Sequence, residues 1–267
     1  MTAYKITSLT NPKIKTLIQL RNRKDRDQSG ETIVEGYREL LRAVGAEVRL
    51  KDFYYCPELL KAYDDQAMLA HVLKLKIAMY EVARNVFEKI AYGDRQEGCL
   101  AVAQAPQFKL EDLKLQAKPF LVVVEKVEKP GNLGAILRIC DGAGVDGVIV
   151  CDGQTDIYNP NAIRASLGTV FTVKVISGTN EDALKFLKSR NMKICAALPS
   201  AKDIYTQMNY NVPLAVVVGS EEEGLSPFWI KNSDFQVRIP MLGKADSLNV
   251  ASSSAILLYE AFRQRNP

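Results

Sequence analysis

Short, continuous apolar runs recur through the second half of the chain. They cover residues 120–125, 147–151, 170–176, 193–197, 214–219 and 235–239. Runs of this length predict strands, and apolar positions that are continuous rather than alternating indicate strands buried on both faces. Patterns of helical spacing separate the runs, so we expect a mostly parallel sheet covered by helices over residues 119–267.

The first half of the chain alternates between strand-like and helix-like patterns. Strands are expected at 32–35, 52–56, near 76–80 and near 99–103, and helices at 37–44, 58–73 and near 82–90. This alternation predicts a small α/β domain over residues 1–105, which is a usual domain size. The polar stretch 106–118 is the expected linker between the two domains.

Composition places the chain among ordinary globular proteins. It has 267 residues, of which 47% are hydrophobic and 25% are charged. These values exclude a disordered chain, a collagen and a coiled coil. No apolar run approaches the ~18 residues that a membrane-spanning helix needs, so we expect no membrane partner.

Histidine and cysteine usage restricts the chemistry. His71 is the only histidine, which nearly excludes histidine dyads and metal sites with several histidine ligands. The five cysteines are widely spaced and form no C-x-x-C pair. We expect no metal, and we interpret the cysteines as reduced thiols that fill the core of a cytoplasmic protein.

Basic residues concentrate at the N-terminus. Residues 1–26 carry seven basic residues and one acidic residue, whereas the whole chain has a net charge of only +4. Such a patch is the footprint expected for contacts with nucleic-acid phosphates. A solvated helix face would give the same pattern, because lysine and arginine are common on protein surfaces.

Two glycine patterns imitate nucleotide-binding motifs. GAGVDG (142–147) matches G-x-G-x-x-G, but it follows a predicted helix and precedes a strand, so we expect it to end the helix and turn the chain. GSEEEGLS (219–226) outlines a P-loop, yet Leu225 stands where the lysine is required and three carboxylates would repel phosphate. Neither pattern predicts a nucleotide site.

Three segments of the second domain form a more specific pattern. They read EKPGNLGAILR (128–138), LAVVVGSEEEGLS (214–226) and IPMLGKADSLNVA (239–251). Together they resemble motifs 1, 2 and 3 of the SpoU (TrmH-like) branch of the SPOUT superfamily of RNA methyltransferases. RASLGTVF (164–171) is similar to a further segment of that family. The resemblance covers about residues 119–265.

Two segments of the first domain extend the resemblance. ITSLTNP (6–12) and IVEGYREL (33–40) resemble the N-terminal RNA-binding domain of many SpoU enzymes, which is similar to a ribosomal-protein fold that binds bent RNA. The resemblance implies that the basic N-terminus belongs to a folded RNA-binding domain. The expected RNA contacts are Lys13, Lys15, Arg21, Arg23, Lys24, Arg38 and Arg164.

The resemblance implies methyl transfer from S-adenosylmethionine to a ribose 2′-hydroxyl. That hydroxyl is a poor nucleophile until its proton is removed or its alkoxide is stabilised. By resemblance Arg138 has this role, as a base or as a group that holds phosphate and alkoxide, and both possibilities stay open because a guanidinium is almost always protonated. Asn132, Glu221, Ser247 and Asn249 match further active-site positions. Asn132, Ser247 and Asn249 could also cap helices.

The resemblance further implies a trefoil knot, three of whose loops hold the cofactor. Here these loops are 198–199, 219–224 and 239–248, and Gly219 would let the backbone approach the ligand closely. The expected cofactor contacts are Leu198, Gly219, Ile239, Met241, Ser247 and Leu248. Because SpoU enzymes generally form dimers through the knot region, we expect a homodimer.

Three alternatives stay open at the level of sequence. Ribosomal RNA is favoured over tRNA because the minimal tRNA enzymes of the family lack the first domain. A protein of the same fold could instead be a non-catalytic RNA-binding or ribosome-assembly factor. A related knotted enzyme could also methylate a base rather than a ribose.

Overall fold

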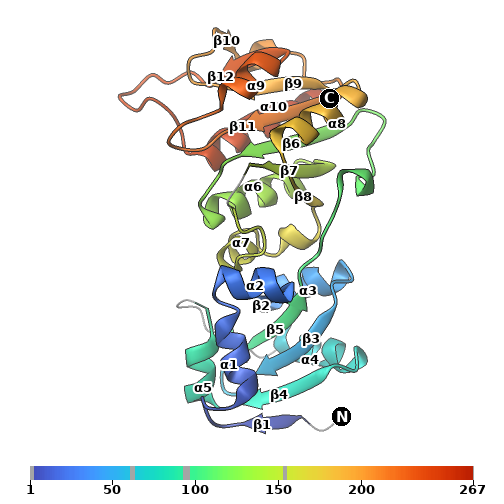
Figure 1. Cartoon of the computed structure of the whole chain (residues 1–267), viewed down its shortest axis with the longest axis vertical. Coiled ribbons are helices and arrows are strands. Elements are labelled where there is room, and N and C mark those ends of the chain that lie inside the picture. Colours follow the sequence, from blue (N-terminus) through green and yellow to red (C-terminus); the bar gives the residue numbers. More distant parts are fainter. Residues whose placement is uncertain (1–2, 61–63, 93–96, 153–154, 267) are drawn as a thin grey trace. The chain divides into compact units, whose positions relative to one another are not determined.

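The computed structural model of the chain describes residues 3–60, 64–92, 97–152 and 155–266. It divides into two compact units (Figure 1). The N-terminal unit contains Met1–Pro106 together with Tyr158–Thr172, and the C-terminal unit contains Gln107–Ile157 and Val173–Pro267. Each unit is built around its own sheet and is described by itself.

The C-terminal unit contains a seven-stranded sheet in which every pair of neighbouring strands is parallel. Its strands, in spatial order, are β10 (Asp203–Ile204), β12 (Phe235–Arg238), β9 (Lys193–Ala197), β11 (Leu214–Val218), β6 (Phe120–Glu125), β7 (Gly147–Cys151) and β8 (Val175–Gly178). Every residue of β6, β7 and β11 is buried. This burial confirms the parallel α/β sheet that the continuous apolar runs predicted.

Helices cover the sheet of the C-terminal unit. They are α6 (Pro130–Gly142), α8 (Asn180–Ser189), α9 (Pro227–Asn232) and α10 (Val250–Arg265), with short 3₁₀ turns η1 (Leu110–Asp112) and η3 (Tyr205–Gln207). Pro130 begins α6, where its missing N–H costs nothing. α10 packs against α6. The turn after α6 contains Gly144 at a φ of +67° and leads into β7, so GAGVDG ends a helix as predicted.

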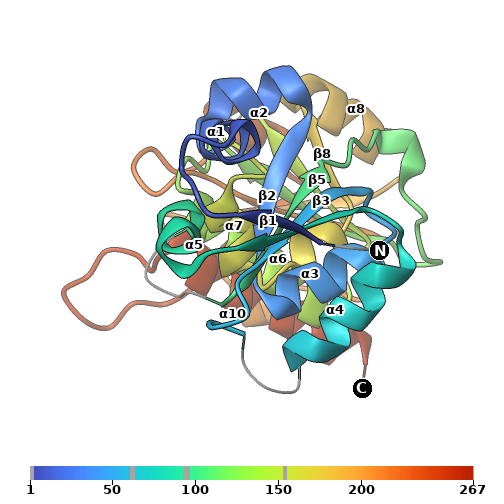
Figure 2. The ribbon, with the colours of Figure 1, turned by 90° about the horizontal axis from the view of Figure 1, so that it is seen from below.

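The N-terminal unit contains a five-stranded mixed sheet. Its strands, in spatial order, are β1 (Tyr4–Ile6), β4 (Ala78–Val82), β3 (Leu50–Tyr55), β5 (Cys99–Gln104) and β2 (Glu31–Glu35), and β5 is antiparallel to both neighbours. Its helices are α1 (Pro12–Gln19), α2 (Arg23–Ser29), α3 (Tyr37–Gly45), α4 (Asp64–Lys74) and α5 (Arg84–Ile90). Figure 2 shows α1 and α2 on one side of the strands and α3 and α4 on the other.

A segment from the second half of the chain packs within the N-terminal unit. It contains α7 (Pro160–Ala165) and the 3₁₀ turn η2 (Thr169–Phe171). Thr32 Oγ1 donates to the carbonyl of Tyr158 at 2.7 Å, and Arg42 donates to the carbonyl of Leu167. Gly168 packs against the backbone of Glu39. The chain therefore joins the two units at three places rather than at one linker.

Several predicted boundaries need correction. The strand predicted at 170–176 is wrong over its first half, because Val170 and Phe171 are buried within η2 and β8 begins only at Val175. α4 begins at Asp64, later than predicted, and residues 61–63 of that prediction lie outside the described residues. The pattern of helical spacing at the C-terminus predicts a last helix over 248–265, and this helix begins two residues later, at Val250. β1, α1 and α2 were not predicted.

All five cysteines are buried with free thiols. Burial raises the pKa of the Cys195 thiol to about 12, so this thiol stays protonated and unreactive. The interpretation of the cysteines as core residues is confirmed. His71 lies in α4 and is exposed. Within the described residues, none of the helices combines the length and the apolar character that crossing a membrane requires.

Replacing Gly168 with alanine should destabilise the N-terminal unit. Gly168 has a φ of +83°, and a Cβ there would lie 2.8 Å from Glu39 Cα. We expect Gly168→Ala to lower the free energy of unfolding by about 1–3 kcal/mol in urea titrations. Gly178→Ala is the matched control, because a Cβ there meets no atom within 4 Å. Equal unfolding midpoints for the two variants would contradict this account.

Candidate functional site

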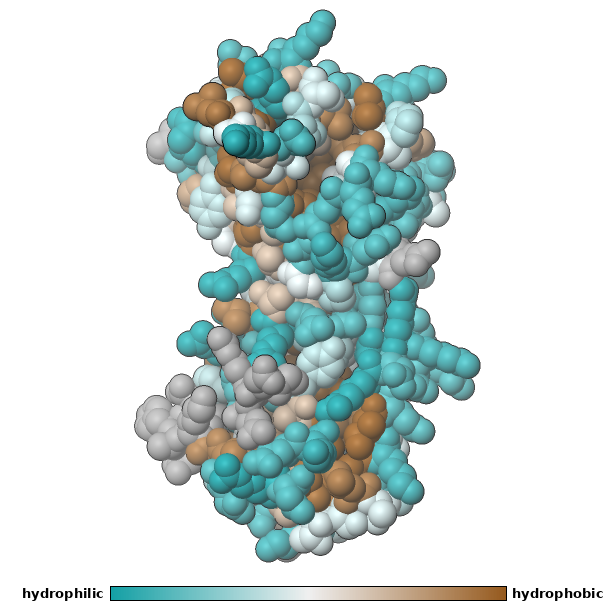
Figure 3. All heavy atoms as spheres, turned by 90° about the vertical axis from the view of Figure 1, so that its left-hand side faces the viewer, coloured by the Kyte–Doolittle hydropathy of each residue, from teal (hydrophilic) through white to brown (hydrophobic). Residues whose placement is uncertain are grey.

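A cavity of about 490 Å³ opens at the carboxyl edge of the parallel sheet. Its walls are the loops that follow three neighbouring strands, namely 198–200 after β9, 219–225 after β11 and 239–248 after β12. Ligands of open parallel sheets bind at this edge. Figure 3 shows a face of the C-terminal unit on which apolar surface is recessed among hydrophilic side chains.

All six residues expected to contact the cofactor line this cavity. They are Leu198, Gly219, Ile239, Met241, Ser247 and Leu248. The lining combines apolar side chains with polar groups, and the volume lies within the usual range for small-molecule sites. The cavity can therefore enclose an apolar ring system and hold polar parts of the same ligand at its loops.

The packing of the loop after β11 requires glycine at position 219, in addition to the predicted approach of this residue to a ligand. A Cβ at Gly219 would lie 2.2 Å from the carbonyl carbon of Gly224 and 2.5 Å from the amide nitrogen of Leu225. The missing side chain thus allows one part of the loop to approach another part of the same loop. The ends of this loop also form an isolated bridge between Ser220 and Gly224.

A buried carboxylate fixes the far end of the same loop. Glu125, at the end of β6, is fully buried and accepts hydrogen bonds from Ser226 N at 2.8 Å and Ser226 Oγ at 2.7 Å. Asn180 Nδ2 donates to Glu125 at 2.7 Å and Asn180 Oδ1 accepts from Trp229 Nε1 at 2.6 Å. Sequence reasoning did not single out this network, which holds the loop 219–226 against the sheet.

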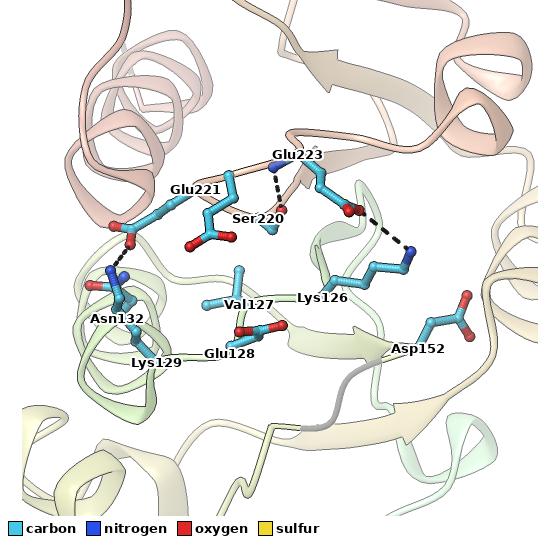
Figure 4. A pocket seen from close by; sticks show the side chains of 10 residues that line it. Lys126, Val127, Glu128, Lys129, Asn132, Asp152, Ser220, Glu221 and Glu223 are labelled. Carbon is cyan, nitrogen blue, oxygen red and sulfur yellow. Dashed lines mark hydrogen bonds and ion pairs between the residues drawn. The ribbon is translucent and has the colours of Figure 1, made fainter.

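A second cavity has a volume of about 280 Å³, and Figure 4 shows the residues that line it. The loops after β6, β7 and β11 contribute its lining. Ser220, Glu221, Glu222 and Glu223 line both cavities. The loop after β11 is therefore a wall that the two cavities share.

Glu221 is the centre of a polar network in this wall. Lys129 Nζ donates to Glu221 Oε2 at 2.7 Å. Asn249 Nδ2 donates to Glu221 Oε1 and, at 3.3 Å, to Asn132 Oδ1. Figure 4 shows Lys129, Asn132 and Glu221 meeting at one side of the smaller cavity.

The network keeps Glu221 ionised. Its pKa is held below the usual range, chiefly by the hydrogen bond from Lys129, although burial opposes this effect. Hydrogen bonds from Asn132 and Asn249 lower the pKa further. A carboxylate in this state accepts hydrogen bonds and orients their donors.

Of the three residues that could have capped helices, only Asn249 does so. Asn249 does cap α10, because its Oδ1 accepts from Ala251 N at 2.9 Å, and its Nδ2 remains available for Glu221. Asn132 is not a cap, since the N-cap of α6 is Lys129 and Asn132 lies in the first turn. Ser247 is exposed and lines the larger cavity, so it does not cap α10 either.

Arg138 lies apart from these residues. It is exposed on α6 and lines neither cavity. No hydrogen bond or ion pair joins Arg138 to another described residue. The structure thus brings together Asn132, Glu221 and Asn249 and places Ser247 in the adjoining cavity.

The basic residues of the N-terminal unit differ in their surroundings. Arg21 donates to the carbonyls of Lys89 at 2.8 Å and Ala91 at 2.7 Å. Lys13 pairs with Asp52 at 2.9 Å, and this hydrogen bond raises the pKa of Lys13. Arg23 is exposed and pairs with Asp27 at 3.3 Å. The other predicted contacts on this end of the chain are also exposed, and they are Lys15, Lys24 and Arg38.

The RASLG segment has an internal structural role. Arg164 is half-buried and donates to the carbonyl of Tyr92. Ser166 is fully buried, donates to the carbonyl of Ile163 at 2.8 Å and accepts from Gly168 N. These contacts end α7 and hold the turn that follows it.

Lys129 is the residue of the network that sequence reasoning missed. Its signal was its place beside Pro130 at the start of a helix, three residues before the motif asparagine Asn132. Among the residues that the structure describes, no group of three or more His, Cys, Asp or Glu side chains is arranged to hold a metal ion.

Comparisons with known proteins match both units. A family model described as the SpoU rRNA Methylase family matches residues 119–259. A model described as an MRM3-like substrate binding domain matches residues 11–101. The chain is 32% identical over 216 residues to the 23S rRNA (guanosine-2'-O-)-methyltransferase RlmB of Pectobacterium atrosepticum, which covers 78% of this chain and 88% of that relative.

Two solved structures resemble the whole chain. A crystal structure of an RNA 2'-O ribose methyltransferase is 39% identical with a TM-score of 0.87, and the match covers 98% of this chain and 99% of that one. An AdoMet-bound rRNA methyltransferase from Sinorhizobium meliloti is 27% identical with a TM-score of 0.88, and the match covers 98% of both chains.

The two hydrogen-bonding roles of Asn249 can be separated. Serine also caps helices well, so Asn249→Ser should leave the free energy of unfolding within about 0.5 kcal/mol of the original, whereas Asn249→Ala should lower it by about 1 kcal/mol. Both variants remove the amide donor to Glu221. Urea titrations measure the difference, and equal losses for both variants would show that capping is not the stabilising role of Asn249.

Proposed function

The chain belongs to the SpoU rRNA methylase family, and from this premise we propose that it transfers a methyl group from S-adenosylmethionine to a ribose 2′-hydroxyl of ribosomal RNA. The observation that carries the proposal is the shared wall at Glu221, between a cavity lined by all six expected cofactor residues and a second, polar cavity. The names of the RNA methyltransferases that the chain resembles support the same reaction.

The larger cavity fits S-adenosylmethionine. Leu198, Ile239 and Leu248 supply apolar surface for the adenine, and the loop 219–224 supplies backbone groups for the polar parts. The AdoMet-bound relative supports this assignment. When bound, S-adenosylmethionine supplies an electrophilic methyl group. The protein must then orient the ribose and keep water from competing for that methyl group.

The acceptor ribose fits the smaller cavity. Glu221, held ionised, accepts hydrogen bonds there, and Asn132 and Asn249 present amide groups on the same wall. Arg138 is exposed on the helix that also carries Asn132, so its guanidinium is accessible to RNA. Arg138 lines neither cavity, so its assignment depends on the motif position that it matches. We assign it the role of holding a phosphate and stabilising the developing alkoxide, because a guanidinium keeps its proton.

We propose that residues 1–105 bind the RNA substrate, with 106–118 as a linker and 119–267 as the catalytic domain, of which Tyr158–Thr172 packs within the N-terminal unit. The match of residues 11–101 to a substrate-binding domain supports the first assignment. Lys15, Arg23, Lys24 and Arg38 are the exposed candidates for phosphate contacts. Lys13, Arg21 and Arg164 contact groups in other parts of the chain, whereas Arg23 pairs with Asp27 of its own helix. We therefore expect smaller effects on RNA binding when Lys13, Arg21 or Arg164 is replaced.

The remaining proposals concern assembly and location. We propose a trefoil knot in the catalytic domain, supported by the packing of α10 against α6 next to the three cofactor loops. We also propose a homodimer, supported by the exposed aromatic residues Tyr259 and Phe262 on α10. Five buried free thiols are compatible with work in the reducing cytoplasm.

Replacing Arg138 tests the catalytic proposal. With methyl-labelled S-adenosylmethionine, the protein should label unmodified ribosomal RNA in preference to tRNA. Arg138→Ala should lower the labelling rate by about 100-fold or more, since removing one group that stabilises an oxyanion costs ~10²–10³ in rate. Cofactor affinity, measured by calorimetry, should be unchanged.

A second arginine variant is the control for Arg138→Ala. Arg190→Ala removes an exposed arginine at the C-cap of α8, outside the three motif segments, so this variant should label RNA at the rate of the unmutated protein. Full labelling by Arg138→Ala would refute the role of Arg138. If the unmutated protein binds the cofactor and RNA but labels neither RNA, the non-catalytic alternative is favoured. If it labels tRNA in preference to ribosomal RNA, the proposed substrate is wrong.

A charged residue on α10 should disrupt the homodimer. Phe262 is 39% exposed, and burying a carboxylate in an apolar interface is unfavourable. We expect the original protein to be a dimer by light scattering and Phe262→Glu to shift it toward the monomer. Leu73→Glu, at an exposed leucine of the N-terminal unit, is the control and should stay dimeric. A monomeric original protein would refute the homodimer.

A further inference from the structure

The smaller cavity presents an electrostatic problem for RNA. Five of its lining residues carry carboxylates, and they are Glu128, Asp152, Glu221, Glu222 and Glu223. Only two of its lining residues are cationic, Lys126 and Lys129. A phosphodiester lies next to every internal ribose, so the RNA backbone must approach this acidic surface. The approach is favourable where a cationic side chain meets the phosphate.

Lys129 is the better placed of the two lysines. It is the N-cap residue of α6, directly before the helix that carries Asn132 and Arg138. Its Nζ lies 2.7 Å from Glu221, yet its side chain is 72% exposed. Lys126 makes a looser contact, 3.9 Å from Glu223, on the opposite side of the cavity in Figure 4.

The Lys129–Glu221 pair can be exchanged at small cost. An exposed ion pair contributes little to stability because water solvates both charges well. Glu221 keeps hydrogen bonds from Asn132 and Asn249 when Lys129 leaves. An ammonium group on a flexible stem has three donors and can turn toward a phosphate without a change in the backbone.

We propose that Lys129 changes partner when RNA binds. In the free protein it holds Glu221, and in the complex its ammonium group binds the phosphate next to the acceptor ribose. This inference rests on the proposed function, because it assigns the acceptor nucleotide to the smaller cavity. The exchange leaves Glu221 Oε2 available to accept a hydrogen bond from the ribose, so RNA binding itself prepares the carboxylate.

The salt dependence of RNA binding measures the phosphate contact. The probe is an unmodified 23S rRNA transcript, titrated at several salt concentrations with saturating S-adenosylhomocysteine. A plot of log affinity against log salt concentration has a negative slope. Loss of one phosphate contact reduces the magnitude of this slope by about 0.7 for single-stranded RNA. Lys129→Ala should show this change, with about fourfold weaker binding at physiological salt.

Two further variants separate the contact from a general charge effect. Lys129→Arg keeps a cation and should retain the original slope. Lys193→Ala removes a lysine that also pairs with a carboxylate, Asp234 at 2.8 Å, but that lines neither cavity. This control should also retain the original slope. If Lys129→Ala showed the same salt slope as the unmutated protein, the proposed exchange of partner would be overturned.

The pH dependence of methyl transfer tests the contact with Glu221. Lys129 is the chief cause of the lowered pKa of Glu221, so the ionised form is present above that pKa and is lost as the pH falls through it. Without Lys129 the pKa rises, and kcat/KM for free RNA should therefore begin to fall at a higher pH. An unshifted acid limb would contradict the contact in the free protein.

Failure of the inference can be distinguished from failure of the proposed function. If the original protein binds the transcript with a measurable salt slope but transfers no methyl group, the proposed function fails while the slope comparison still decides the phosphate contact. If the original protein methylates the transcript and Lys129→Ala keeps its slope and its pH profile, only the inference fails. If Lys129→Ala binds the cofactor with the same affinity as the unmutated protein, the variant is folded.

Discussion

The seven strands of the C-terminal sheet run in the same direction, so the loops after β6, β9, β11 and β12 all leave from one edge. Both cavities and the wall between them are built from these loops. Buried strands hold the loop ends rigidly, and the buried carboxylate of Glu125 fixes the loop after β11. The chemistry that we propose depends on this edge, because it brings residues 132, 221 and 249 together from distant parts of the chain.

The electrostatics of the site follow from the same arrangement. Glu221 stands where two cavities meet and is kept ionised by one cation and two amides. An ionised, partly exposed carboxylate can orient donors and can accept the proton that the 2′-hydroxyl loses. It cannot stabilise the developing alkoxide, and that is the role that we assign to Arg138. The exchange proposed for Lys129 would link these roles, since the phosphate that attracts Lys129 also brings the ribose to Glu221.

The strands of the C-terminal sheet could be predicted because their apolar runs reflect burial on both faces. The run at 170–176 misled because a buried 3₁₀ turn has the same apolar composition as a buried strand. The motif resemblance identified six residues that line the larger cavity, but not the packing that requires glycine at position 219, since the atoms that Gly219 approaches belong to a turn of the same loop. Lys129 escaped notice because its partner lies 92 residues away. Charge counting could not separate Arg21, which holds backbone carbonyls, from the exposed Lys24.

The central claim is that the two cavities join a methyl donor to a ribose hydroxyl. The most direct measurement is the chemical position of the methyl group in ribosomal RNA treated with the protein and labelled S-adenosylmethionine. A 2′-O-methyl group blocks alkaline cleavage of the adjacent phosphodiester. The label should therefore survive alkaline hydrolysis in a resistant dinucleotide. Label recovered on a nucleobase of an ordinary mononucleotide would contradict it.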